Sequence, residues 1–449
     1  MNKPIPSVRE ARLTASLSLP HIVALYVGSV VGSGILMVPG LAADLAGPAS
    51  IVAWLLMSVL VVPLALTMGL LASRYPSAGG VSTFVREAYG NRAGNIAGWL
   101  FLLSVPLGGP VLAVTGARYV SVLLGWGALQ TYTLAALILI VPLAMNVFGL
   151  RLAGRIQTVV VAVILAILLL AIGAAVPHYE AANFTPFAPH GWGSVARAAC
   201  LMFWCFIGWE AVTHLSSEFR NPRRDAVHGV LWSAGVVAAL YFAVAFLAVA
   251  TRSYGGAGSA ASLSLMVQLS LGKTGGWMVA VAALFICFAA HNAYSSAASR
   301  VAYSLAQAGA APAWLGRLHR SYRTPVGGLA FVAAGNAIGL AALCSGWITL
   351  AGLIVLPNAT FIATYIAGCL AGVKLLRGHR LGYAVSWISC VATLAIYPFL
   401  GWPALYPAAV VALLLIAGRV RERRAITSRG VLEGRRQIAV NRTENEPRP

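Results

Sequence analysis

The sequence predicts an all-α polytopic membrane protein of about twelve transmembrane helices. Hydrophobic residues make up 59% of the 449 residues, charged residues make up only 9%, and the mean hydropathy is +0.83. Soluble domains carry about a quarter charged residues, so most of this surface does not face water. A membrane-spanning helix needs about 20 mostly apolar residues, and the chain contains a regular series of such runs.

The apolar runs divide the chain into a short N-terminal segment over 1–20, a transmembrane domain over 21–418 and a basic tail over 419–449. The last two runs are short and separated only by Gly401-Trp402. An even number of spans places both termini on one side of the membrane. The expected spans are 21–46, 49–72, 94–125, 130–149, 154–176, 194–215, 229–251, 276–308, 326–345, 347–371, 382–400 and 403–418.

The distribution of basic residues predicts the orientation. All but four of the 31 Lys and Arg residues fall in loops on one face or in the tail, and the other face carries Arg118, Arg197, Arg252 and Lys273. Such an excess marks the cytoplasmic side, so both termini are expected in the cytoplasm, with the protein in a cell inner membrane. The net charge of +20 then reflects topology and contact with anionic lipid, and not nucleic-acid binding.

Motifs for other chemistry are lacking in the sequence. The six cysteines form no C-x-x-C pair and no His cluster accompanies them, so neither a metal site nor a cofactor is expected. There is no G-x-x-x-x-G-K-[ST] phosphate loop and no recognisable catalytic set, which argues against ATP drive and against an enzyme.

The composition of the first span predicts an interruption in its helix. Gly32, Ser33 and Gly34 lie at mid-depth and are followed by Pro39-Gly40, where a continuous helix is costly. Unwound backbone in lipid is tolerated only where it faces a cavity or ligand. The alternative is simple helix packing, because Gly28 and Gly32 also form a G-x-x-x-G face.

The sixth span offers a second interruption at Gly208, next to Glu210. A carboxyl group inside a span is expensive and by default a functional hypothesis, although it can also be a hydrogen-bonded packing residue. His214 follows four residues later on the same helical face. This pair could sense or carry a proton, or His214 could simply reach the cytoplasmic interface.

The two interrupted spans are five helices apart, as expected for inverted repeats over 21–176 and 194–371, followed by helices 11 and 12. Interrupted helices in corresponding halves point to a substrate site. Freed amides attract an anion and freed carbonyls attract a cation. A ligand with both charges close together, an α-amino acid, suits such a site.

Five motifs occur along the chain in a fixed order. They are Gly32-Ser33-Gly34-Ile35 with Pro39-Gly40, Tyr75-Pro76-Ser77-Ala78-Gly79-Gly80, Phe206-Ile207-Gly208-Trp209-Glu210, Glu218-Phe219-Arg220-Asn221-Pro222 and Ser299-Arg300-Val301-Ala302-Tyr303-Ser304-Leu305-Ala306. At these residues the chain resembles the amino acid–polyamine–organocation (APC) transporter superfamily over nearly its whole length. Three further segments, Gly98-Trp99-Leu100-Phe101-Leu102, Met202-Phe203-Trp204-Cys205-Phe206 and Ala371-Gly372-Val373-Lys374-Leu375-Leu376, resemble most closely its bacterial L-methionine and branched-chain amino acid exporters.

The resemblance implies a LeuT-like fold with discontinuous helices 1 and 6 and alternating access around a midplane site. It implies that amides of Ser33 and Gly34 hold the substrate carboxylate, that carbonyls near Val30, Trp204 and Ile207 receive the ammonium group, and that Trp204 is an aromatic gate. It also implies that Glu210 responds to protonation. The expected substrate-binding residues are Val30, Gly32, Ser33, Gly34, Trp204, Phe206, Ile207 and Gly208, with Glu210 and His214 in coupling.

The apolar residues Val30, Phe206 and Ile207 suit Met, Leu, Ile or Val as substrates. The resemblance favours a secondary active exporter working by proton antiport. An uptake permease or exchanger is the alternative, and a channel is the alternative outside the transporter class. Protons are favoured over sodium, for which Ser295 or Ser296 is the candidate, and the sequence indicates no oligomeric state.

One departure from the proton-coupled relatives concerns the fifth span. It lacks the mid-helix lysine that some of them carry, and Gln157 is the nearest polar residue. His291 and Asn292 in the eighth span either line the transport path or bond neighbouring helices. The Glu218 turn is expected to form a cytoplasmic latch with Arg74, Arg86 and Arg300; the alternative is that these arginines are ordinary topology charges.

Overall fold

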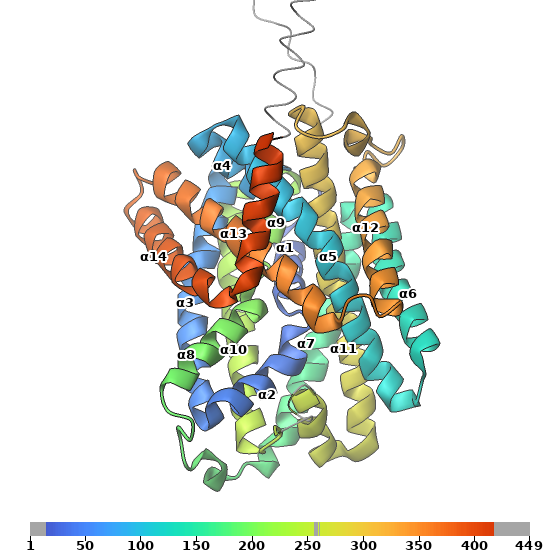
Figure 1. The fold of residues 1–449 in the computed structure, drawn as a ribbon, viewed down its shortest axis with the longest axis vertical. Helices are drawn as coiled ribbons and strands as arrows, with labels where there is room; N and C mark the ends of the chain where they lie inside the picture. Colours follow the sequence, from blue (N-terminus) through green and yellow to red (C-terminus); the bar gives the residue numbers. More distant parts are fainter. Residues whose placement is uncertain (1–14, 256–258, 260, 417–449) are drawn as a thin grey trace, which may run out of the picture.

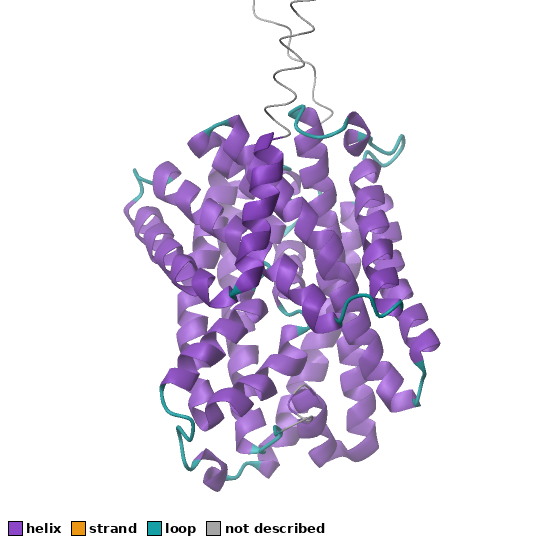
Figure 2. Ribbon diagram, viewed as in Figure 1, coloured by secondary structure: helices purple, strands orange, loops and turns teal. Residues whose placement is uncertain are grey.

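The computed structural model describes residues 15–255, 259 and 261–416. These residues form a tall bundle of helices (Figure 1), and the connecting loops lie mainly at its two ends (Figure 2). The described part contains no strand beyond a single isolated bridge between Leu17 and Phe219. The predicted tail over 419–449 lies outside the described residues, and the segment over 1–20 is described only from Ala15.

Each of the expected spans falls on helical structure. In the first half, two short helices share the first span, and α4 lies between the second and third spans. The helices are α1 (Leu19–Val30), α2 (Gly34–Ala46), α3 (Ser50–Arg74), α4 (Val81–Tyr89), α5 (Asn91–Leu124), α6 (Ala128–Val147) and α7 (Leu150–Ala175).

The second half begins with another divided span. Its helices are α8 (Gly193–Met202), η4 (Phe203–Phe206), α9 (Trp209–Thr213), α10 (Pro222–Ala250), α11 (Ser262–Gln307), α12 (Val326–Cys344), α13 (Leu350–Leu375), α14 (Arg380–Ile396) and a last helix over Trp402–Ile416. α11 is longer than its predicted span because it includes a short helix before Gly272, and this short helix meets the span at a kink.

The composition of these helices fits a membrane. In the described residues, nine helical stretches are long and apolar enough to cross a bilayer, and three shorter apolar helices accompany them. Large apolar side chains face outward, as shown by Val59 (65% exposed), Leu169 (61%) and Ile338 (71%). An apolar surface of this extent requires lipid to cover it.

Several loops and termini meet at one end of the bundle, which we call the basic end. Figure 1 shows α4, loop 308–325 and the end of the last helix there. Loop 214–221 also belongs to this end, because Glu218 and Arg220 line one cavity with Arg323 and Thr324 of loop 308–325. The amides of Ser16 and Leu17 donate to the Glu218 carbonyl at 2.9 and 3.0 Å, and the Arg220 amide donates to the Leu17 carbonyl at 2.9 Å. These bonds tie the start of the described chain across the basic end of α9.

Candidate functional site

Both predicted helix interruptions are present. α1 ends at Val30 and α2 begins at Gly34, while α8 gives way to the single 3-10 turn η4 before α9 begins at Trp209. The helix does not break at Pro39, however, because α2 continues through it to Ala46. Nearby, the Tyr119 hydroxyl donates to the Leu36 carbonyl at 3.0 Å. This bond joins α2 to α5.

Glycines bring the two interruptions into contact. A Cβ atom at Gly208, where φ is +140°, would lie 2.8 Å from Val30 Cγ2 and 2.9 Å from the carbonyl of Ser29. A Cβ atom at Gly34 would lie 2.6 Å from Cys205 Sγ. Side chains at these positions would force the two segments apart, so glycine is required for their close approach.

The alternative of a simple G-x-x-x-G packing face explains only one of its two glycines. A Cβ atom at Gly28 would lie 2.0 Å from Gln157 Nε2, so this glycine does admit a side chain of α7. Around Gly32 the nearest such contacts are at 3.9 Å, and this residue lines a cavity instead. Gly28 therefore serves packing, and Gly32 belongs to the interruption.

Two buried tyrosines satisfy the backbone that the interruptions expose. The Tyr241 hydroxyl from α10 lies 2.8 Å from the Val30 carbonyl and 2.9 Å from the Cys205 carbonyl, one from each interrupted span. The Tyr365 hydroxyl from α13 accepts from the amides of Gly208 and Trp209 at 2.9 and 3.0 Å. Without these hydroxyls, the Cys205 carbonyl and the Trp209 amide would lack partners, at a cost of about 1–3 kcal/mol each.

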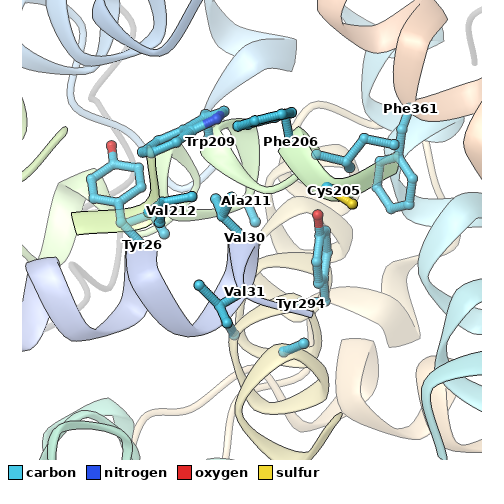
Figure 3. Packing of buried hydrophobic residues seen from close by; sticks show 14 of the residues in the cluster. Tyr26, Val30, Val31, Cys205, Phe206, Trp209, Ala211, Val212, Tyr294 and Phe361 are labelled. Carbon is cyan, nitrogen blue, oxygen red and sulfur yellow. The ribbon is translucent and has the colours of Figure 1, made fainter. Parts of the chain in front are cut away.

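A cavity lies beside the interruptions, with about 500 Å³ of empty space when the open solvent at its mouth is included. Figure 3 shows Val30 at the end of α1 beside the segment that carries Phe206 and Trp209, with the Tyr294 ring reaching toward Cys205. The lining contains no Asp, Glu, Lys or Arg, and His291 is its one basic side chain. The lining comprises Ser29, Val30, Gly32, Ser33, Gly34, Val105, Gly108, Gly109, Leu112, Trp204, Ile207, Ala290, His291, Tyr294 and Phe361.

Six of the expected substrate-binding residues line this cavity, namely Val30, Gly32, Ser33, Gly34, Trp204 and Ile207. The other two lie behind the wall. Phe206 is 1% exposed and packs between the rings of Trp54 and Tyr241, with centroids 6.1 and 5.3 Å away. Gly208 lies against the backbone of α1, where the Ser29 hydroxyl donates to its carbonyl at 3.1 Å.

Glu210 is fully buried just outside the cavity wall. Its carboxyl group accepts from the Gly208 amide at 3.0 Å and from the hydroxyl of Tyr294 at 3.3 Å. Tyr294 also lines the cavity, so one hydroxyl connects the carboxyl group with the cavity. No ion pair joins Glu210 to a basic side chain among the described residues.

His214 is also fully buried, but it does not form a pair with Glu210. Its ring packs against Phe101, with centroids 4.2 Å apart, and no hydrogen bond joins it to Glu210 in the described part of the chain. A Cβ atom at Gly80 would lie 2.4 Å from His214 Nδ1, so this glycine admits the ring. His214 therefore packs α9 against the turn before α4.

Polar side chains connect α6, α7 and α11 on the far side of the first interruption. Gln157 Nε2 donates to the Ala289 carbonyl at 3.1 Å, and Gln157 Oε1 accepts from Asn292 at 2.8 Å. Asn292 in turn accepts from Asn146 at 2.8 Å, and the Ser296 hydroxyl donates to Asn146. Asn292 thus bonds neighbouring helices, whereas His291 faces the cavity.

The expected latch at the Glu218 turn involves Arg300. Arg300 Nε lies 2.8 Å from Glu218 Oε1, with only 1% and 6% of the two side chains exposed. Arg300 also donates to the Ser299 hydroxyl at 3.0 Å. The pair holds the end of α11 against the segment that binds Ser16 and Leu17.

Two contacting helix interruptions beside a cavity in an apolar bundle define the site of a membrane transport protein. Comparison with known proteins identifies the family. The family described as "Amino acid permease" matches residues 17–417, so the chain belongs to this family of APC transporters. It is therefore a multi-pass membrane protein that transports amino acids.

Two curated bacterial proteins are similar along most of their length. An uncharacterized amino acid permease of Bacillus subtilis, YecA, is 39% identical over 87% of this chain and 92% of its own. The L-methionine/branched-chain amino acid exporter YjeH of Escherichia coli is 33% identical over 90% of this chain and 95% of its own.

Among solved structures, MhsT in complex with L-phenylalanine matches with a TM-score of 0.65 at 15% sequence identity, covering 88% of this chain and all of that one. This match confirms the predicted LeuT-like fold with discontinuous helices 1 and 6.

Sequence reasoning missed the parts of the site contributed by other helices. These are the α5 wall at Gly108-Gly109, Tyr294, Phe361 and the two tyrosines Tyr241 and Tyr365. Gly108-Gly109 between Pro106 and Pro110 was a usable indication, because small residues in a membrane helix mark a place of close approach. A lone tyrosine in an apolar span carries no comparable indication, since its partner depends on the tertiary arrangement.

Proposed function

We propose that this protein is a secondary active transporter that exports neutral apolar L-amino acids, namely Met, Leu, Ile and Val, by proton antiport. In this proposal it works by alternating access in a bacterial inner membrane, with both termini in the cytoplasm. The observation that carries the proposal is the cavity beside both interruptions, which offers backbone groups and apolar side chains and no fixed charge for a charged side chain. The exporter YjeH, similar along nearly the whole chain, supports the substrate class and the direction.

The substrate carboxylate would bind at the start of α2. No backbone acceptor among the described residues pairs with the amides of Ser33 and Gly34, whereas the Gly32 amide already donates to the Val30 carbonyl at 2.7 Å. Both unpaired amides belong to cavity-lining residues. A carboxylate there would accept two N–H bonds at the positive end of α2.

The ammonium group would bind at the second interruption. The Val30 carbonyl already accepts from Gly32 and lies beside the Tyr241 hydroxyl, so its lone pairs are engaged. The carbonyls of Trp204 and Ile207 accept no hydrogen bond within the described residues. These two carbonyls are therefore the better acceptors for the ammonium group.

The substrate side chain would occupy the apolar wall of Val105, Leu112, Ile207 and Phe361. These four side chains would contact an unbranched or branched apolar side chain such as that of methionine or leucine. Trp204 would act as the gate: it is only partly buried, and its indole Nε1 lies 3.4 Å from the Ser33 hydroxyl of the opposite interruption.

Glu210 would couple transport to protons. A buried carboxyl group without a basic partner is stable when protonated and costly when ionised. Loss of its proton would strengthen the bonds from the Gly208 amide and the Tyr294 hydroxyl and so change the second interruption. The proton and the substrate would thereby act on the same segment.

Counterflow in proteoliposomes tests the proposal. Vesicles loaded with unlabelled methionine or leucine should accumulate the labelled amino acid, and an imposed pH gradient should drive net flux while a sodium gradient does not. Lysine and glutamate serve as controls that should not compete. Absence of saturable flux for every neutral amino acid would overturn the substrate assignment.

The uptake permease or exchanger remains the second candidate, because the same cavity serves either direction and the family is named for permeases. Net flux in right-side-out vesicles with the pH gradient reversed separates the two. A channel would show flux without counterflow.

A further inference from the structure

A second cavity lies at the basic end and serves no part of the proposed transport reaction. Its empty space is about 670 Å³ when the open solvent at its mouth is included. Its lining comes from the N-terminal segment, the start of α7, loop 214–221, α11 and loop 308–325. The lining residues are Ala15, Ser16, Gly149, Arg151, Glu218, Arg220, Arg300, Tyr322, Arg323 and Thr324. We call this space the arginine pocket.

The arginine pocket has an excess of positive charge. Of its four arginines, Arg300 is neutralised by Glu218, the one carboxylate of the lining. No ion pair within the described residues engages Arg151, Arg220 or Arg323. Three guanidinium groups around one cavity repel one another unless an anion lies between them.

The turn that carries Arg323 is held rigidly. The His319 amide donates to the Thr324 carbonyl at 2.8 Å, and the Arg323 amide donates to the His319 carbonyl at 3.0 Å. The Thr324 hydroxyl, on a residue only 3% exposed, donates to the Val147 carbonyl at 2.8 Å. These bonds dock the turn on the end of α6.

Arg323 itself has φ of +55°, in the left-handed region that non-glycine residues avoid. Such strain persists only where the surroundings impose it, and it recurs at ligand clamps. Ser16 also lines the pocket, and its hydroxyl oxygen is buried without a hydrogen-bond partner among the described residues. A strained arginine and an unpartnered hydroxyl thus border the same space.

We propose that the arginine pocket binds a phosphate group at the membrane surface, from the headgroup of an anionic phospholipid or from a soluble phosphate compound. Guanidinium groups match phosphate oxygens in charge and geometry, and the Ser16 hydroxyl supplies a further donor. Basic pockets between membrane helices are suited to such headgroups. This inference does not depend on the transported substrate.

Binding would stabilise one state of the basic end. The pocket is assembled from five segments only while Ser16 and Leu17 are bonded to Glu218 and the Glu218–Arg300 pair is intact. A ligand that binds only the assembled pocket stabilises that arrangement by mass action. Phosphate would therefore hold the basic end closed.

The test uses the full chain in two arms, with Arg220→Gln/Arg323→Gln as the pocket variant. The control variant is Arg320→Gln/Arg377→Gln, which removes the same charge from exposed positions outside the pocket. The lipid arm titrates phosphatidylglycerol into phosphatidylcholine nanodiscs and follows thermal stability and the lipid retained in native mass spectrometry. The soluble arm titrates inorganic phosphate, against chloride at equal ionic strength, into protein in detergent.

We expect saturable stabilisation of the wild type in at least one arm, and the responding arm identifies the source of the phosphate. The pocket variant should bind about thirtyfold more weakly, equivalent to about 2 kcal/mol for two basic residues, while the control variant keeps wild-type affinity. Equal losses in both variants would indicate only a diffuse charge effect and would overturn the site. Absence of stabilisation in both arms would overturn it as well.

Discussion

Replacement of Gly208 by alanine tests whether close contact between the two interruptions is required. Its φ of +140° is a conformation that residues with a side chain rarely adopt, which costs about 1–3 kcal/mol. The added Cβ atom would also lie 2.8–2.9 Å from Val30 and from the backbone of Ser29, and overpacking of this kind costs a further 1–3 kcal/mol, roughly. Because the contact is with backbone, rotation of a side chain cannot relieve it. We therefore expect destabilisation of about 2–6 kcal/mol.

The assay is thermal unfolding of purified protein in detergent, together with methionine counterflow. Gly208→Ala should lower the melting temperature by at least about 5 °C and abolish counterflow. Gly235→Ala is the matched control, because Gly235 lies within α10 with open space around its Cβ position. It should be neutral or stabilising by up to about 1 kcal/mol. If the two variants behave alike, the interruptions do not depend on this contact.

Three further variants test separate parts of the account. Tyr241→Phe removes the hydroxyl beside the carbonyls of both interruptions, so it should destabilise the protein by about 1–3 kcal/mol. It should also weaken methionine binding in a scintillation proximity assay, and unchanged binding would argue against a positioning role for Tyr241. Glu210→Gln fixes a neutral side chain, so counterflow should persist while its dependence on pH flattens, and a wild-type pH profile would remove Glu210 from proton coupling. Glu218→Arg leaves Arg300 buried and unpaired at a cost of about 3–5 kcal/mol and should stop transport. The double variant Glu218→Arg/Arg300→Glu restores a pair of opposite charges and should recover part of the transport activity. Full transport by Glu218→Arg alone would refute the latch.

Much of the fold could be predicted because the bilayer imposes a strong constraint on composition. Every expected span falls on helix, and both interruptions occur at the glycines that indicated them. The boundaries of α11 were less accessible, because an apolar stretch before Gly272 packs as a separate short helix. Pro39 gave a misleading indication, since a proline within a membrane helix is tolerated where neighbouring side chains satisfy the backbone.

The site was predictable in its backbone and less so in its side chains. Gly32, Ser33 and Gly34 line the cavity as their motif suggested, because unwound backbone must face a ligand or a cavity. The helical spacing of Glu210 and His214 suggested a pair, but α9 is only five residues long and His214 packs against Phe101 instead. Partners from distant spans, such as Tyr365, depend on how the two repeats pack, and local sequence does not encode that arrangement directly.

The position of a heavy atom in the bound substrate shows whether the substrate lies beside the two interruptions. Crystals of the protein grown with L-selenomethionine as substrate, from protein containing ordinary methionine, would give an anomalous peak for the selenium atom. We predict one peak in the cavity, against Val105, Leu112 and Phe361, with the amino acid backbone at Ser33 and Gly34. A peak elsewhere in the bundle, under conditions that saturate binding, would contradict it.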